Sequence, residues 1–272
     1  MFDIIHEDAD LLVVHKPADL VCHPTKGDEY SSLISRARIY LHRAYTANSQ
    51  PSTVNAQPFL VHRLDRETSG LVVIAKNPAA ARELGKIWET RAVQKEYHAI
   101  VHDHIAAEHG IIDAPLGKDE TSIVAIKDCV RPDGTPAQTE FFVEKRFFVA
   151  ATVSSPQNDQ PRSHERGHAS SSAFSLLRLL PHTGRKHQLR IHLAHLGHPI
   201  VGDKIYGGDP DLYLALVERR LTDEQRARLI LPRHALHAGR IQFVWRERTY
   251  DFTTPPEADF AQFLASGQEN QP

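Results

Sequence analysis

Short apolar stretches with the composition of β-strands recur along this chain, and they constrain its fold more than any other feature. Branched aliphatic and aromatic residues, which favour extended backbone, dominate these stretches. Short or moderate connections separate several of them, and that spacing favours a mixed or antiparallel sheet. The stretches are LLVVHKP (11–17), LVVIAK (71–76), EYHAIV (96–101), TEFFVEKRF (139–147), FSLLRLL (174–180), IQFVWR (241–246) and TYDFTTPP (249–256).

Three segments carry helix signals. NPAAARELGKIWETR (77–91) opens with Asn77 as an N-cap and Pro78 at the first helical position. GRKHQLRIHLAHLG (184–197) places three leucines along one stripe and ends in glycine, and TDEQRARLI (222–230) is a further candidate. We therefore expect an α+β fold, in which a mixed and largely antiparallel β-sheet is flanked by helices and loops.

The 272 residues suit one domain with decorated loops, which we expect to span 1–272. Two polar stretches without periodicity, 47–58 and 154–172, are predicted to be loop insertions. The N-terminal segment carries acids where a signal peptide carries basic residues, and no apolar run approaches the roughly 20 residues that span a bilayer. We expect a cytoplasmic monomer without membrane association, with Cys22 and Cys129 as unpaired thiols.

The formal net charge of −2 gives no whole-molecule sign of a nucleic-acid partner. The segment from 181 to 207 differs, because it holds two arginines and two lysines against Asp203 alone, with five histidines besides. A chain that is nearly neutral can therefore still carry a basic face.

The stretch HRLDRETSGLVVIAK (62–76) crowds charge directly before an apolar strand. Asp65 lies on the connection between two strand-like runs, a place where rigid elements commonly hold catalytic groups. Taken alone, the residues favour a plainer interpretation, in which Asp65 caps a turn that Thr68, Ser69 and Gly70 complete. The arginines on either side of Asp65 are then solvated surface charges.

The stretch TGRKHQLRIHLAHLGHPIVGDKIYG (183–207) raises two ligand hypotheses. Arg185 and Lys186 fall at the predicted helix start, where free backbone N–H groups also attract anions, so they form a candidate phosphate-binding corner. An exposed polar helix end is the alternative. His192 and His195 are spaced to share a helix face, but no HExxH pattern or further ligand accompanies them, so we expect no metal.

Three motifs in this order, HRLDRETSGLVVIAK, KEYHAIV (95–101) and GRKHQLRIHLAHLGHPIVGDKIYG, resemble the RluA-type family of pseudouridine synthases. The opening segment IIHEDADLLVVHKPADLVCHP (4–24) is similar to the entry strand and KP turn of that family. The resemblance runs from about residue 4 to about residue 250, and the HRLDRxTSG and GRxHQLRxH patterns are long and specific.

The resemblance implies the catalytic fold of that family and the conversion of specific uridines in structured tRNA or rRNA to pseudouridine, without cofactor or metal. Asp65 matches the catalytic aspartate of the family. A carboxylate suits a reaction that breaks an N-glycosidic bond, because the cleavage builds positive charge at C1′. Two roles stay open for Asp65, attack on C1′ and abstraction of a sugar proton to give a glycal.

The resemblance also implies roles for other residues. Arg190 matches the arginine that pairs with the catalytic aspartate and keeps it ionised, and Arg185 is the second choice, with phosphate as its expected ligand. Tyr97, by itself an ordinary half-buried strand aromatic, matches a tyrosine that stacks on the target base and assists proton transfer. Arg63 matches a residue that fills the gap left by the flipped uridine. The other predicted RNA-binding residues, without firmer roles, are His62, Arg66, Lys186 and His187.

Many relatives carry a small RNA-binding domain ahead of the catalytic one. The strand pattern here begins at residue 4, so we expect no separate N-terminal RNA-binding domain. A catalytically idle RNA-binding or ribosome-assembly factor of the same fold is the main alternative, although a binding role has no need of Asp65. A hydrolase built on Ser69, His62 and Asp65 is a weaker alternative, because no GxSxG elbow surrounds the serine.

Overall fold

The structure is a computed structural model that describes residues 2–24, 31–47, 57–150 and 171–268. The predicted loop insertions at 47–58 and 154–172 lie almost wholly outside these ranges. Within the described ranges, none of the helices combines the length and the apolar character that crossing a bilayer requires.

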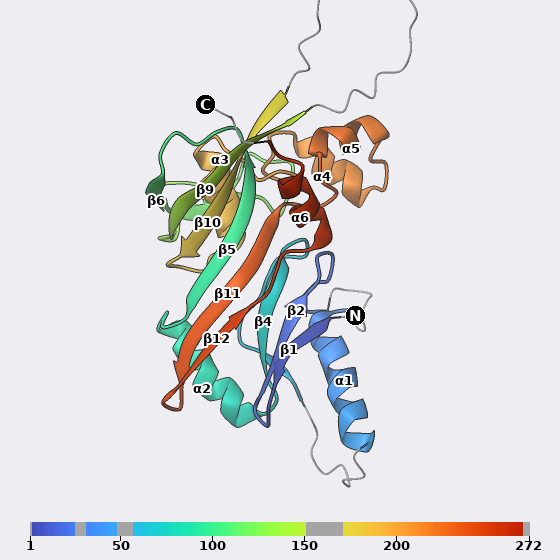
Figure 1. The fold of residues 1–272 in the computed structure, drawn as a ribbon, viewed down its shortest axis with the longest axis vertical. Helices are drawn as coiled ribbons and strands as arrows, with labels where there is room; N and C mark the ends of the chain where they lie inside the picture. The colour runs from blue at the N-terminus through green and yellow to red at the C-terminus, as the bar shows by residue number, and fades with distance from the viewer. Residues whose placement is uncertain (1, 25–30, 48–56, 151–170, 269–272) are drawn as a thin grey trace, which may run out of the picture.

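Ten strands form one sheet, which runs the length of the molecule in Figure 1. The strands are β1 Asp3–Glu7, β2 Leu11–Lys16, β3 Phe59–Leu60, β4 Ser69–Ala75, β5 Gln94–His102, β6 His109–Asp113, β9 Gln138–Ala150, β10 Ser171–Pro181, β11 Leu236–Trp245 and β12 Arg248–Thr253. Their order is β1-β2-β4-β11-β5-β10-β9-β6, with β3 beside β4 and β12 beside β11. Among the described strand pairs of this sheet, β4 with β11 is parallel and the others are antiparallel. The predicted mixed, largely antiparallel sheet is therefore confirmed.

The central strand β4 is buried along all seven residues because helices cover both of its faces. Val72 and Ile74 point toward α1 (Leu33–Ala47) and share a core cluster with its leucines. Leu71 points the other way and packs with residues of α2 (Pro78–Glu89). Strand side chains alternate between the two faces, so this apolar run is fixed from both sides and holds the preceding loop in place.

The other helices are α3 Gln188–His195, α4 Pro210–Val217, α5 Asp223–Leu229 and α6 Ala258–Ala265. The predicted helix at 77–91 is confirmed, and the Asn77 side chain accepts a hydrogen bond from Ala80 N as the N-cap. The candidate at 222–230 is also confirmed, with a capping box in which Thr222 and Gln225 satisfy each other's backbone N–H groups.

The predicted helix at 184–197 is wrong at its start, because α3 begins only at Gln188. The Gln188 side-chain oxygen accepts hydrogen bonds from Thr183 Oγ1 (2.6 Å) and Arg185 N (3.0 Å), which bend the preceding residues into a turn. His187 then adopts a left-handed conformation with φ of 55°. Arg185 and Lys186 are therefore on a turn and not on the first turn of the helix.

The parallel contact between β4 and β11 requires glycine at position 70. Gly70 has a φ of +118°, and a Cβ atom there would lie 2.3 Å from Ala238 O. We expect Gly70→Ala to lower the free energy of unfolding by about 2–4 kcal/mol, because backbone strain and overpacking add. Urea denaturation measures this change.

The matched control for this variant is Gly85→Ala. Gly85 lies within α2, and a Cβ there meets no atom within 4 Å. Alanine favours a helix interior, so this change should raise the free energy of unfolding by up to about 1 kcal/mol. Equal stability of the two variants would contradict the close approach at Gly70.

Candidate active site

The connection at 61–68, between β3 and β4, is tied down at several points. Leu64 is buried, its N–H donates to Cys22 Sγ (3.4 Å), and the thiol donates back to Leu64 O (3.5 Å). The fully buried Lys16 ammonium donates to Arg66 O (3.0 Å) and to two carbonyls of its own turn. The backbone on either side of residue 65 is therefore held by core residues from the N-terminal segment.

Asp65 lies between these anchors. Thr68 N donates to Asp65 O (3.3 Å), so the turn that the residues alone favoured does form. The Thr68 side chain is paired with the buried His234 ring (Oγ1 to Nε2, 2.8 Å). Arg63 and Arg66 are exposed, and neither side chain makes a hydrogen bond or ion pair with the residues that the structure describes. The charged head of the motif thus separates into one carboxylate facing inward and two guanidinium groups facing solvent.

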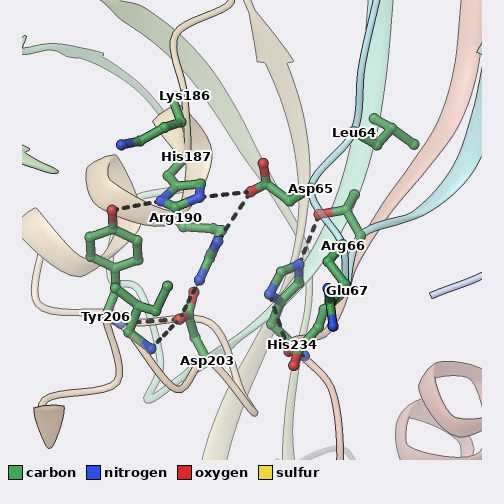
Figure 2. Close-up of polar contacts among 12 residues, drawn as sticks. Leu64, Asp65, Arg66, Glu67, Lys186, His187, Arg190, Asp203, Tyr206 and His234 are labelled. Carbon is green, nitrogen blue, oxygen red and sulfur yellow. Dashed lines mark hydrogen bonds and ion pairs between the residues drawn. The ribbon is translucent and has the colours of Figure 1, made fainter. Parts of the chain in front are cut away.

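A chain of charges leads inward from Asp65, as Figure 2 shows. Arg190 Nη1 donates to Asp65 Oδ2 (3.1 Å), and the Arg190 side chain is only 6% exposed. The same guanidinium donates through Nε (2.7 Å) and Nη2 (2.9 Å) to the two oxygens of Asp203, which is fully buried. Of the two arginines considered from the sequence, Arg190 is the one that meets Asp65, and Arg185 is not.

His187 approaches the same carboxylate from the residue directly before α3. Its Nε2 lies 3.9 Å from Asp65 Oδ2, and its Nδ1 lies 2.9 Å from the Tyr206 hydroxyl. Burial lowers the pKa of His187 to about 4, so the ring is neutral at pH 7. His187 therefore belongs with Asp65 and Arg190 in one cluster.

Asp65 stays ionised although it is largely shielded from solvent. Burial raises the pKa of the carboxyl, while positive charge at His187 and Arg190 lowers it, and the net shift is downward. Because His187 is neutral at pH 7, Arg190 supplies the positive charge there. The site thus holds a desolvated carboxylate without protonating it.

Tyr97 lies on β5, where its register partners are Leu179 on β10 and Ala238 on β11. Its ring packs against two of the core clusters of the sheet. Burial raises the pKa of the Tyr97 hydroxyl, and the negative charge of Asp65 raises it further. Tyr97 is consequently a phenol at neutral pH, near enough to Asp65 to respond to its charge.

Two predicted phosphate ligands already have partners in the protein. Arg185 Nε donates to Pro136 O (3.2 Å). Lys186 Nζ donates to Ile126 O (3.0 Å) and forms an ion pair with Asp128 (2.8 Å). Lys186 is therefore directed toward the hairpin formed by β7 (Leu116–Lys118) and β8 (Asp128–Val130), whereas Arg185 contacts the segment between β8 and β9. Lys186 points away from Asp65 in Figure 2.

The structure does not bring His62 to Asp65. Its Nε2 accepts a hydrogen bond from Val73 N (3.0 Å), and its ring stacks on Trp88 of α2 with centroids 5.3 Å apart. The Ser69 hydroxyl is paired with the fully buried His237 (2.9 Å). The hydrolase arrangement of Ser69, His62 and Asp65 is therefore not assembled.

The histidines of α3 have separate environments. His192 is fully buried and bonds Thr139 Oγ1 (2.9 Å) and Ala114 O (3.0 Å), whereas His195 is exposed. In the described part of the chain, no three His, Cys, Asp or Glu side chains gather as metal ligands would. The partners of His192 are those of a structural histidine.

Sequence reasoning gave no site role to Asp203, Tyr206, Lys16 or Cys22. The first two lie in the GDKIYG part of the long motif, where Asp203 was counted only as a charge opposing the lysines and arginines. Their contacts with Arg190 and His187 depend on a turn that folds back onto α3, so linear spacing did not reveal them.

Buried neutral histidines should make the protein sensitive to acid. Burial lowers the pKa to about 3 at His62 and His234, and to about 4 at His187 and His237. Between pH 6.5 and 4 these histidines bind protons in the unfolded chain but stay neutral in the folded chain. The free energy of unfolding therefore falls as the pH is lowered. Each pKa unit is worth about 1.4 kcal/mol, and we expect a loss of several kcal/mol, measured by urea denaturation at pH 7.5 and pH 5.

The histidines can be compared one at a time. His62→Gln should weaken the pH dependence of the free energy of unfolding, because one buried imidazole is removed. His195→Gln, at an exposed position of α3, should leave the slope unchanged. If the free energy of unfolding depended on pH equally in the wild type and in His62→Gln, His62 would not be one of the histidines that make the protein sensitive to acid.

Comparison with known proteins identifies the family of this chain. The model of the RNA pseudouridylate synthase family matches residues 10–195, so the chain belongs to this family. That confirms the family resemblance and the predicted isomerase class. The human protein RNA Pseudouridylate Synthase Domain Containing 1 has the same fold, with a TM-score of 0.69 and 24% identity over 98% of this chain and 88% of that one.

Two curated relatives are named ribosomal large subunit pseudouridine synthase D. The Haemophilus ducreyi protein is 32% identical over 264 residues, which cover 96% of this chain and 69% of the relative. The Escherichia coli K12 protein is 33% identical over 208 residues, 76% of this chain and 53% of the relative. The chain thus spans about half of the second relative and about two thirds of the first.

Proposed function

We propose that this chain is an RNA pseudouridine synthase in which Asp65 is the catalytic carboxylate. The observation that carries the proposal is the Asp65 side chain, held by Arg190 Nη1 at 3.1 Å on a loop anchored from both sides. In the reaction the N1–C1′ bond breaks and a C5–C1′ bond forms, while C5 loses a proton and N1 gains one. Atoms and electrons balance without a co-reactant, as an isomerisation requires.

A carboxylate with these surroundings suits the first step. Cleavage of the glycosidic bond develops positive charge at C1′, which a nearby anion stabilises or traps. Full solvation would weaken that interaction, and protonation would abolish it. The buried Arg190 supports an ionised, partly desolvated Asp65, and this serves both attack on C1′ and removal of a sugar proton.

The other predicted residues differ in their surroundings, and these surroundings support different roles. Tyr97 remains a phenol, which supports stacking on the target base and proton donation rather than action as a phenolate base. Arg63 and Arg66 are exposed on the same loop, which supports contacts with RNA, Arg63 filling the gap left by the extruded uridine. We further propose RNA contacts for Arg185 and Lys186, with Lys186 acting together with the hairpin that it contacts. The packing of His62 supports a structural role for that residue.

The names of the curated relatives make large-subunit rRNA the first substrate to test, with tRNA as the second. We propose that the protein acts as a monomer in the cytoplasm. The direct assay uses transcripts carrying [5-³H]uridine, because forming the C5–C1′ bond releases the C5 hydrogen to water. Tritium release from either RNA is the expected result. Binding of the transcripts without any release would instead favour an RNA-binding or ribosome-assembly factor of the same fold.

A further inference from the structure

The turn at 203–206 contacts both groups that face Asp65. Asp203 and Tyr206 belong to this turn, and the Asp203 Oδ1 atom accepts hydrogen bonds from Ile205 N (2.9 Å) and Tyr206 N (3.0 Å). One carboxylate therefore shapes the turn and holds Arg190 at the same time. In Figure 2, Tyr206 lies on the side of His187 away from Asp65, and Asp203 lies on the side of Arg190 away from Asp65.

The contact with Asp203 fixes the direction of Arg190. Two parallel bonds, from Nε and Nη2, hold the planar guanidinium against the Asp203 carboxylate. With that edge occupied, Nη1 is left to donate to Asp65 Oδ2 (3.1 Å). The Tyr206 ring lies beside the same group, 5.0 Å from the Arg190 Cζ atom.

Tyr206 also determines which tautomer the His187 imidazole adopts. The Tyr206 oxygen accepts a hydrogen bond from Asp128 N (3.3 Å) and lies 2.9 Å from His187 Nδ1. At the other end of the ring, Nε2 faces the Asp65 carboxylate at 3.9 Å, which favours a proton on Nε2 over a lone pair. The Tyr206 hydroxyl then donates to Nδ1, so both ends of the ring favour one tautomer.

We propose that Asp203 and Tyr206 are positioning residues for the reaction at Asp65. Asp203 directs Arg190, and Tyr206 fixes the Nε2–H tautomer of His187, so that two N–H groups face the single oxygen Oδ2. Among the described residues none donates a hydrogen bond to Oδ1, which leaves Oδ1 as the oxygen that reacts with the substrate. The inference rests on the proposed function for its chemistry, although the tautomer can be measured without it.

Tyr206→Phe tests the proposal with the smallest change, because the ring beside Arg190 is kept. We expect the single-turnover rate of tritium release to fall about 10–100-fold, as is typical when an outer hydrogen-bond partner is lost, with unchanged affinity for RNA. Nitrogen-15 NMR of the histidine rings, with the His187 signals identified by their loss in His187→Gln, should show Nε2–H in the wild type. The Nδ1–H form should gain population in Tyr206→Phe.

Asp203→Asn tests the other half, and Asp251→Asn is its control because Asp251 makes an exposed paired contact with Arg240. Asp203→Asn should lower the rate of tritium release at saturating enzyme without lowering the affinity for RNA. Asp251→Asn should leave both the rate and the affinity unchanged. A wild-type rate and an unchanged His187 tautomer in Tyr206→Phe would overturn the proposal. If the wild type released no tritium, the proposed function would fail, and the tautomer measurement alone would decide the positioning by Tyr206.

Discussion

Asp65→Asn is expected to abolish pseudouridine formation, with a rate at least about 10⁴-fold below that of the wild type, as is found when an essential catalytic group is removed. The amide keeps the size of the carboxylate and an oxygen that can accept from Arg190 Nη1, so the loop should keep its conformation. It has neither the negative charge to stabilise C1′ nor the basicity to accept a sugar proton. Both chemical roles left open for Asp65 are therefore lost together.

The measurement is single-turnover tritium release, paired with filter binding of the same transcript. Affinity for RNA should stay within a few-fold of the wild type, because the exposed Arg63 and Arg66 are untouched. Asp251→Asn on the exposed β11–β12 pair removes an aspartate of similar charge and should be fully active. Retained activity in Asp65→Asn would remove the residue from the mechanism, and lost affinity would make it a binding residue.

Much of the fold follows from local sequence because local and tertiary preferences agree there. The apolar run after Gly70 has the composition of a β-strand and is buried on both faces in the fold, so β4 could be predicted closely. Asn77 and Pro78 specify the start of α2 whatever packs against the helix. For the site, the family motifs identified Asp65 and Arg190 as partners, and the distance between them agrees.

The rest depends on contacts between distant residues. The start of α3 was misplaced because the Gln188 side chain, not a small polar cap, organises the residues before it. His62 stands three residues before Asp65 but packs on Trp88, which only the tertiary fold brings near. The contact between Asp203 and Arg190 could not be predicted for the same reason, since the two residues are 13 positions apart along the chain.

The second large effect is expected at Arg190, a buried cation that pairs with both Asp65 and Asp203. Arg190→Met should lower the free energy of unfolding by about 3–5 kcal/mol, because Asp203 is then left buried and charged without its partner. Activity should fall to the level of Asp65→Asn, since burial without Arg190 raises the pKa of Asp65. Urea denaturation and tritium release measure the two losses separately.

Two further measurements distinguish the effect of Arg190 on stability from its effect on catalysis: the pH dependence of the stability of Arg190→Met, and a double variant. In the wild type, burial raises the pKa of Asp203, and Arg190 together with His234 and the Tyr206 N–H lowers it, so that the net shift is downward. Without Arg190, we expect burial to raise that pKa above its unfolded value. The folded variant then binds a proton more readily than the unfolded chain, so its stability deficit relative to the wild type should shrink as the pH falls from 7 to 5. Adding Asp203→Asn to Arg190→Met removes the unpaired charge and should restore part of the stability at pH 7, but none of the activity. Restored activity would mean that Arg190 serves only to neutralise Asp203, whereas an inactive but stabilised double variant is the result expected if Arg190 also acts on Asp65.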